Sequence, residues 1–126
     1  MMTIPLPELD TITKIQMAIR GRQLSLGDEK KLQTELSNAF NAHGITFDRE
    51  VNLDKANIVD FMIDGLAVEI KIRAKASAMQ IYRQLERYCA FPEVKALLLM
   101  TSKAMSLPAS INGKPVYVLS LSRAQL

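Results

Sequence analysis

Two carboxylates and a lysine lie close together in the segment NIVDFMIDGLAVEIKI, residues 57–72. Its Asp64–Gly65 pair, set between two alternating apolar runs, predicts a β-hairpin with a two-residue turn. In that register Asp60 faces Glu69 across the hairpin. Lys71 lies two residues beyond Glu69, hence on the same face of the strand. Paired acids with a neighbouring lysine are a chemical constellation that needs an explanation.

Two carboxylates placed opposite each other require something that offsets their repulsion. Directly paired β-carbons lie about 4.5–5.5 Å apart, and like charges so placed destabilise a sheet. Two unit charges about 5 Å apart repel by roughly 3 kcal/mol at an effective dielectric constant near 20. A divalent cation such as Mg²⁺, which takes carboxylate oxygens and keeps several waters, would offset this repulsion. An ammonium beside a metal-bound water can orient that water and stabilise negative charge on a phosphate.

A plainer interpretation of the same residues stays open. Solvated sheets commonly carry acids and lysines on neighbouring strands, and Lys71 could simply pair with either carboxylate. A three-residue turn would also break the pairing of Asp60 with Glu69. Only the combination of hairpin register, acid pair, lysine and apolar flanks favours the metal site over a wet hairpin face.

The elements around this hairpin can be predicted from patterning. Leu9, Ile12, Ile15 and Ile19 recur at helical spacing, and Ser25 with Asp28 resembles a capping pair before a second helix. One apolar face of the hairpin is predicted to lie on the core: Val59, Phe61, Ile63, Val68, Ile70 and Ile72. Helices are predicted at about 8–23, 28–42 and 75–90, and strands at about 45–53, 57–63, 66–73 and 94–101, with a last, shorter strand after the turn INGKP.

This order, α-α-β-β-β-α-β-β, predicts an α/β (α+β) fold with a mixed β-sheet flanked by helices. The length of 126 residues fits one domain. The single cysteine, Cys89, excludes an internal disulfide framework and fits a reducing cytoplasm. We find no signal peptide and no apolar run that would span a bilayer, so we expect a cytoplasmic protein without a membrane partner. The net charge of +3 permits contact with a polyanion without demanding it.

The hairpin and its surroundings resemble the PD-(D/E)XK nuclease superfamily, which has the restriction-endonuclease-like fold. Asp60 followed by Glu69-Ile70-Lys71 resembles the family's motif, although IVD stands where the motif's PD would be. The family's core of helix, three strands, helix and strand corresponds to residues 28–101. The resemblance divides a single nuclease-like domain, 1–126, into an N-terminal extension at 1–24, the core at 28–101, and a C-terminal turn and strand at 102–126.

This resemblance implies a metal-dependent nuclease that hydrolyses DNA phosphodiester bonds and is directed by DNA structure or ends rather than by sequence. Asp60, Glu69 and the backbone carbonyl of Ile70 would bind Mg²⁺ or Mn²⁺. Lys71 would help to activate the attacking water. Holliday-junction resolvases of the superfamily have a comparable size, which suggests a homodimer as the acting form.

The resemblance also extends to residues on the flanking helices. Glu35 stands where many members carry a supporting glutamate, although it could be an ordinary solvated helix residue. RecB-type and lambda-exonuclease-type nucleases carry a Q-x-x-x-Y motif on the next helix, and Gln84 with Tyr88 matches it. By this resemblance Gln84, like Glu35, would support the catalytic site. Tyr88 could equally be a core aromatic residue. The residues expected to contact DNA are Arg73, Lys75, Arg83, Arg87 and Tyr88.

Two other functions stay open. The chain could be a non-catalytic DNA-binding or protein-interaction module with the same fold, although such a module has no need of a repulsive acid pair. It could also be a small α+β interaction protein whose hairpin face is simply solvated. Carboxylates of Asp60 and Glu69 on opposite faces of the sheet would favour that last interpretation.

Overall fold

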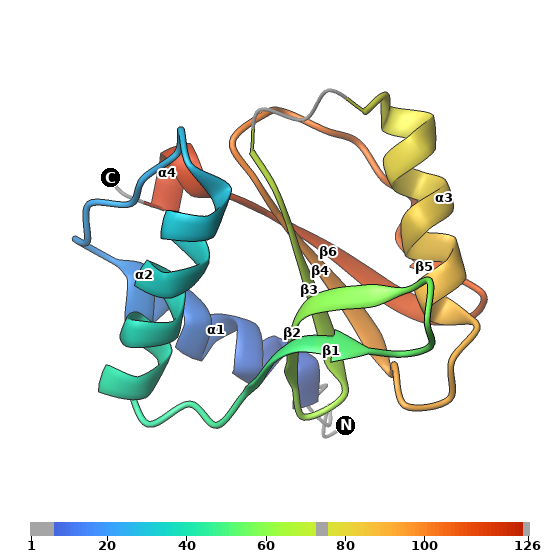
Figure 1. Ribbon diagram of the computed structural model, residues 1–126, viewed down its shortest axis with the longest axis horizontal. Coiled ribbons are helices and arrows are strands. Elements are labelled where there is room, and N and C mark those ends of the chain that lie inside the picture. The colour runs from blue at the N-terminus through green and yellow to red at the C-terminus, as the bar shows by residue number, and fades with distance from the viewer. Residues whose placement is uncertain (1–6, 73–75, 125–126) are drawn as a thin grey trace, which may run out of the picture.

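The computed structural model, which describes residues 7–72 and 76–124, is built around a mixed six-stranded sheet (Figure 1). Its elements in chain order are α1 (Pro7–Ile19), α2 (Glu29–Ala42), β1 (Asp48–Asn52), β2 (Ile58–Ile63), β3 (Leu66–Lys71), α3 (Ala78–Cys89), β4 (Ala96–Thr101), β5 (Ser110–Ile111), β6 (Lys114–Ser120) and α4 (Leu121–Ala124). The strand order is β1-β2-β3-β4-β6-β5. Strands β1 to β3 pair antiparallel, whereas β3, β4 and β6 pair parallel. The coarse prediction of an α+β protein with a mixed sheet is therefore confirmed.

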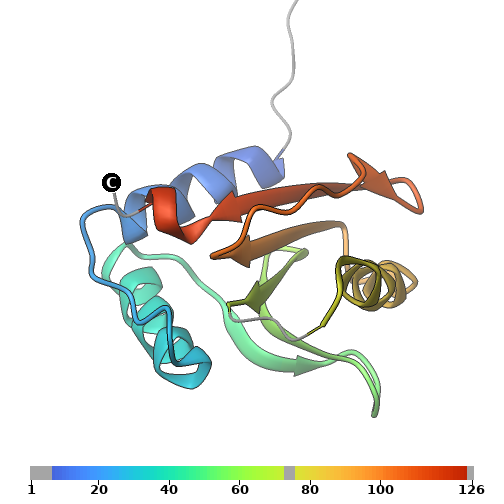
Figure 2. The same cartoon turned by 90° about the horizontal axis from the view of Figure 1, so that it is seen from above.

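Helices cover both faces of this sheet. Figure 2 shows α1 and α2 on one side of the central strands and α3 on the other. One cluster of buried side chains joins α1 and α2 to the sheet, and a second joins α3 to it. Strand β4 lies between the two clusters, and all its residues are buried, as its continuous apolar run predicts. Among the residues that the structure describes, no helix combines the length and the apolar composition that crossing a bilayer requires.

The hairpin of β2 and β3 has the predicted two-residue turn. Asp64 and Gly65 both have positive φ, 49° and 81°, as a type I′ turn requires. Cα pairing places Phe61 opposite Val68, which is the expected register. Pairing of the two strands stops there, and the rest of β2 pairs with β1 alone, with Val59 opposite Val51 in that register. Moving away from the turn, the two strands therefore separate at Asp60, one residue beyond the last pair.

This separation corrects the prediction for the hairpin's core face. Five of the six apolar residues assigned to that face lie in the cluster beneath α1 and α2, but Val59 lies in the cluster beneath α3. Val59 differs because β2 has already left β3 at that point. The opposite face, which carries the acids, is also covered, since Ala67 is buried and Met62 packs in the α3 cluster.

Local hydrogen bonds set where the helices begin. The N-cap of α2 is Asp28, whose side chain accepts from the Lys31 N–H, so the predicted pairing of Ser25 with Asp28 as a capping motif is wrong. Helix α3 begins after Ser77, which forms a reciprocal capping box with Gln80. The box explains why this helix starts later than its composition predicted.

The C-terminal region differs from prediction in two ways. Asn112 and Gly113 form a second turn with positive φ at both residues, and the turn joins β6 to the two-residue strand β5, which the sequence did not predict. Strand β6 has seven residues against six in β4, so it is not the shorter strand that we expected.

The hairpin turn gives a first testable prediction, because its geometry requires glycine at position 65. A Cβ on Gly65 would lie 2.7 Å from Cγ of Lys95, and the residue has φ of 81°. We expect Gly65→Ala to lower the free energy of unfolding by roughly 2 kcal/mol, since the left-handed region alone costs an L-residue about 1–2 kcal/mol. Urea denaturation followed by circular dichroism measures this loss.

Gly113→Ala is the matched control. Gly113 has φ of 75° in the equivalent Asp/Asn-Gly turn position, but nothing lies within 4 Å of an added Cβ. The free energy of unfolding of Gly113→Ala should therefore fall only by the cost of placing alanine in the left-handed backbone conformation. Equal losses for both variants would show that the contact with Lys95 relaxes freely.

Candidate functional site

Asp60 and Glu69 form an acid pair at the point where β2 leaves β3. The backbone N–H of Asp60 lies 3.4 Å from Oε1 of Glu69, to which it donates. Oδ2 of Asp60 accepts a hydrogen bond of 2.8 Å from the N–H of Ile70, so the side chain of Asp60 takes up a backbone donor of β3. Glu69 is only 3% exposed. The structure thus brings the two carboxylates together in a covered position and not on a solvated or divided face.

Lys71 reaches the acid pair from its open end. Its Nζ lies 3.2 Å from Oε2 of Glu69, and its side chain is 22% exposed against 4% for that of Glu69. The ammonium therefore has contact both with the pair and with solvent. Asp60, Glu69 and Lys71 are brought together, although the predicted direct pairing of Asp60 with Glu69 is not formed, because pairing of β2 with β3 ends at Phe61 and Val68.

Helix α2 contributes a residue that sequence reasoning missed. Gln33 is 7% exposed, and its Nε2 donates a 3.1 Å hydrogen bond to Oδ1 of Asp60. Its Oε1 accepts from Nη2 of Arg49 at 3.3 Å. The signal was present in the sequence, because Gln33 shares the buried helical stripe of Leu36 and Phe40, where a polar residue needs partners.

Glu35 does not join the acid pair, so this sequence-based assignment is wrong. Its two carboxylate oxygens accept from the N–H and the hydroxyl of Ser25, at 2.7 and 2.9 Å. Two helical positions separate it from Gln33, which is a rotation of about 200° around the helix. Glu29, the first residue of α2, interacts electrostatically with the acid pair. Partial burial raises the pKa of Glu29 most, and the charge of Asp60 raises it further.

Helix α3 closes the site from the other side. Tyr88 is 1% exposed; its hydroxyl donates to the carbonyl of Ile58 at 2.8 Å and accepts from Nε2 of Gln84 at 2.9 Å. Burial, followed by the charges of Glu69 and Asp60, raises the pKa of Tyr88. The Gln84–Tyr88 pair therefore forms a wall next to the acids. The predicted contact of Tyr88 with DNA is wrong, because the ring is buried and the hydroxyl is engaged.

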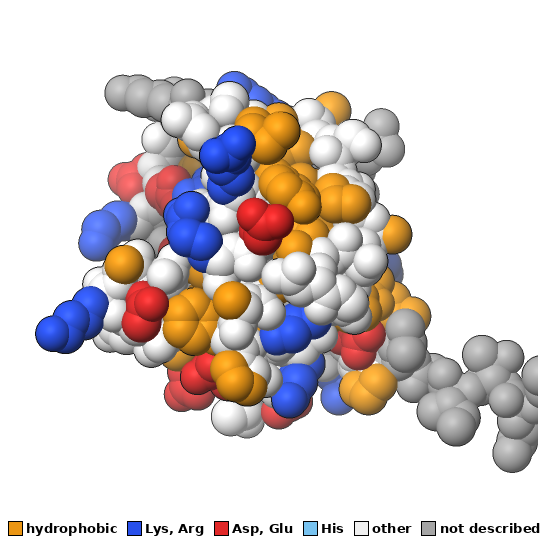
Figure 3. Space-filling view, turned by 90° about the vertical axis from the view of Figure 1, so that its right-hand side faces the viewer, with side chains coloured by type: hydrophobic (Ala, Val, Ile, Leu, Met, Phe, Trp, Pro, Cys, Tyr) orange, Lys and Arg blue, Asp and Glu red, His pale blue; other side chains and the backbone are white. Residues whose placement is uncertain are grey.

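Of the remaining four residues expected to contact DNA, the structure describes two. Arg83 and Arg87 are exposed on α3, and Nε of Arg87 donates to Oδ1 of Asn57 at 3.2 Å. Figure 3 faces this side of the molecule, where Lys and Arg side chains are interspersed with Asp and Glu side chains beside a band of hydrophobic side chains. Arg73 and Lys75 lie outside the described residues.

The acid pair carries an unfavourable negative charge. Burial raises the pKa of Glu69 most, the charge of Asp60 raises it further, and the value reaches about 8. Burial likewise raises the pKa of Asp60, against the opposing effects of the Ile70 hydrogen bond and of Lys71. Lys71 opposes both shifts without cancelling them. At neutral pH the pair therefore favours a bound proton or an additional cation.

The donor set defines which cation the pair could hold. Carboxylate oxygens suit hard cations such as Mg²⁺ and Mn²⁺. Across residues 7–72 and 76–124, no three His, Cys, Asp or Glu side chains converge to form a complete metal-binding group. A cation at the acid pair would thus need backbone oxygens and waters to complete its coordination.

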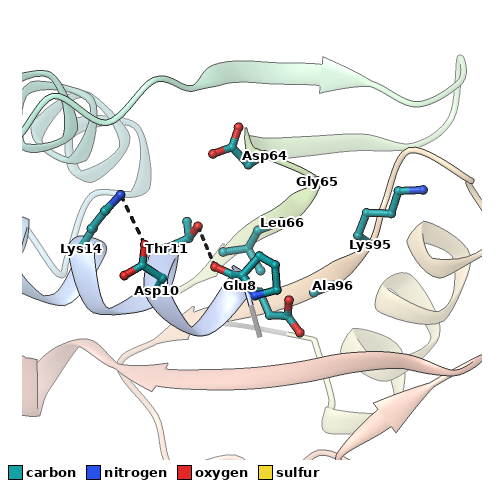
Figure 4. Close-up of a pocket in the computed structure, with 10 residues that line it drawn as sticks. Glu8, Asp10, Thr11, Lys14, Asp64, Gly65, Leu66, Lys95 and Ala96 are labelled. Atoms are coloured by element: carbon teal, nitrogen blue, oxygen red, sulfur yellow. Dashed lines mark hydrogen bonds and ion pairs between the residues drawn. The ribbon is translucent and has the colours of Figure 1, made fainter. Parts of the chain in front are cut away.

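A separate cavity of about 350 Å³ lies beside α1 and the hairpin turn (Figure 4). It adjoins Gly65 and Leu66 at the start of β3, whereas the acid pair lies towards the end of that strand. Polar groups of α1 in this cavity already have partners: Lys14 pairs with Asp10 at 3.4 Å, the hydroxyl of Thr11 donates to a backbone carbonyl, and Glu8 accepts from the hydroxyl of Tyr117. The acid pair is therefore the stronger candidate site.

Comparison with known proteins identifies no relative. No protein-family profile matches the chain, and no curated protein or solved structure matches it either. The geometry of the acid pair and the residues around it is thus the basis on which a function can be assigned.

Glu69→Gln tests the charge state of the acid pair. The folded pKa of Glu69, about 8, exceeds its usual value of 4.5, so its stabilising contribution is complete below the lower value and is lost as the pH rises through the higher one. We expect the wild-type free energy of unfolding to fall by at least about 2 kcal/mol from pH 5 to pH 9, because each tenfold difference in proton affinity between the folded and unfolded chain contributes roughly 1.4 kcal/mol. Glu69→Gln should lose most of this slope.

Denaturant titrations at each pH measure the slope directly. Glu86→Gln is the matched control, because Glu86 is exposed on α3 and should leave the wild-type slope intact. Parallel curves for wild type and Glu69→Gln would contradict a proton held by the buried carboxylate of Glu69.

Proposed function

We propose that this protein is a metal-dependent nuclease of the PD-(D/E)XK superfamily that hydrolyses phosphodiester bonds in DNA. The acid pair carries the proposal: two covered carboxylates on adjacent strands, with the Lys71 ammonium 3.2 Å from Glu69. The order α2-β1-β2-β3-α3-β4 supports the restriction-endonuclease-like core that the resemblance implies. The mixed sheet, with helices on both faces, agrees with that core.

The acid pair fits a hard divalent cation. Each of its four carboxylate oxygens has one neighbouring donor, and a carboxylate oxygen can accept twice, so each keeps capacity for a further bond. Asp60, Glu69 and the backbone carbonyl of Ile70 would hold Mg²⁺ or Mn²⁺ together with waters. A cation there would neutralise phosphate charge and lower the pKa of a water.

Lys71 is the residue that we assign to direct contact with the attacking water and the phosphate. Its ammonium is partly exposed at the open end of the pair, where it can donate hydrogen bonds to an attacking water and to a phosphate oxygen. Its positive charge would stabilise the negative charge that develops on the phosphate. Glu29 replaces Glu35 as the supporting acid of α2, because its charge interacts with those of Asp60 and Lys71.

The other residues would support the site and the substrate. Gln84 holds Tyr88, which packs beside the acids and shapes the wall on the α3 side. Arg83 and Arg87, one helical turn apart and both exposed, would contact the phosphate backbone. Such contacts are salt-dependent and insensitive to base sequence, so DNA structure or ends would select the substrate. We also propose that the protein acts on DNA as a homodimer.

A second candidate is a non-catalytic DNA-binding or protein-interaction module on this fold. It is favoured by two observations: Lys71 already pairs with Glu69, and within the described part of the chain no third ligating side chain joins the acids. The raised pKa of Glu69 disfavours it, since a buried repulsive pair lowers stability and contributes nothing to binding a polyanion.

Cleavage assays decide between these two functions. Purified protein incubated with branched, linear and single-stranded DNA plus Mn²⁺ should cleave at least one substrate. Asp60→Ala and Lys71→Ala should each reduce the rate by roughly a hundredfold or more, because each removes a group that acts on the transition state. Asp48→Ala and Lys55→Ala remove exposed charges elsewhere and should retain wild-type rates.

Thermal unfolding of each variant confirms that it folds. Cleavage that survives in both Asp60→Ala and Lys71→Ala would assign the activity to another site or another protein. Absence of cleavage on every substrate would favour the non-catalytic module.

A further inference from the structure

We propose that Gln33, backed by Arg49, is a positioning residue that fixes the carboxylate of Asp60 without neutralising its charge. This inference rests on the proposed function for its purpose, but the geometry stands on its own. Asp60 is held at both oxygens: Oδ1 by Nε2 of Gln33 at 3.1 Å, and Oδ2 by the N–H of Ile70 at 2.8 Å. The two donors come from α2 and β3, on either side of β2.

The chemistry of the three side chains determines how Gln33 is oriented. A guanidinium only donates hydrogen bonds, and an ionised carboxylate only accepts them. Gln33 lies between one of each, with its Oε1 accepting from Arg49 and its Nε2 donating to Asp60. Flipping the amide would leave both neighbours with a mismatched partner. Arg49 therefore selects the orientation in which Gln33 donates to Asp60.

A neutral amide suits this position better than a cation would. An arginine in direct contact with Asp60 would form an ion pair and compete with a divalent cation for the carboxylate. Through Gln33, Asp60 receives a hydrogen bond and keeps its full charge. Hydrogen bonds of this kind to a ligating carboxylate orient it and tune its affinity for a metal.

Burial makes this arrangement costly to disturb. Gln33 is 7% exposed, and Nε of Arg49 is buried without a hydrogen-bond partner among the described residues. Arg49 on β1 lies opposite Phe61 on β2, and Phe61 is the residue that follows Asp60. The chain Arg49–Gln33–Asp60 thus ties α2 to both strands, and removal of Gln33 would leave buried groups unpaired on each side.

Hydrogen exchange of the metal-free protein tests the positioning directly. Gln33→Leu keeps the buried volume but removes both hydrogen bonds. We expect the amide of Ile70, which bonds to Asp60, to exchange at least about tenfold faster in this variant, while the amide of Leu99 on β4 is unchanged. Thr34→Val, which removes an exposed side-chain hydrogen bond on the same helix, is the matched control and should leave Ile70 at its wild-type rate.

Two outcomes would overturn the inference. An unchanged Ile70 rate in Gln33→Leu would mean that Asp60 needs no help from α2. An increase shared equally by Ile70 and Leu99 would mean that Gln33 contributes only to global stability.

Calorimetry with Mn²⁺ separates this inference from the proposed function. If wild type binds Mn²⁺, Gln33→Leu should weaken the affinity about 10–100-fold. Arg49→Met should act in the same direction, and the double variant should be no weaker than Gln33→Leu alone, because the two residues act in series. Wild-type affinity in Gln33→Leu would overturn the positioning role. If wild type binds no Mn²⁺, the nuclease proposal fails, and the Ile70 exchange rate still decides whether Gln33 fixes Asp60.

Discussion

The repulsion between the buried carboxylate of Glu69 and the partly buried carboxylate of Asp60 is the constraint on which the rest of this structure depends. Burial raises the pKa of both groups, the charge of Asp60 raises that of Glu69 further, and for Glu69 the value reaches about 8. A folded chain gains nothing in stability from such a pair. What surrounds it is a set of hydrogen-bond donors, from the Ile70 amide, Gln33 and Lys71, which hold the acids in place without removing their excess charge.

The fold creates this pair by interrupting its own sheet. The Asp64–Gly65 turn fixes the hairpin register, and pairing of β2 with β3 ends at Phe61 and Val68. Beyond that point the carboxylate of Asp60 accepts the N–H of Ile70 on β3. Since β2 has moved away, α2 can reach Asp60 from one side while α3 covers Glu69 from the other. The strand separation is thus what turns two facing residues into an enclosed site.

Much of this could be predicted from the sequence, because the strongest signals were local. An Asp-Gly pair between alternating runs determines both the turn and the register, and the register places Asp60 beside Glu69. The apolar run of β4 likewise predicts its double burial. Turn chemistry and side-chain alternation depend only on neighbouring residues, so a single sequence contains them.

The failures concern helix phase and tertiary context. Choosing Glu35 instead of Gln33 is an error of two positions, which on a helix points the side chain to nearly the opposite side. Tyr88 was predicted to contact DNA, because no local sequence feature indicates that α3 directs its side chain inward to the carbonyl of Ile58. The two-residue strand β5 is too short for any periodicity, and the departure of β2 from β3 has no signature in either strand.

The central claim is that the acid pair is arranged to hold a divalent cation. Anomalous diffraction from crystals soaked in Mn²⁺ tests it most directly. We predict a single strong manganese peak in contact with carboxylate oxygens of both Asp60 and Glu69 and with the backbone carbonyl of Ile70. Well-ordered carboxylates with no manganese between them would contradict this claim.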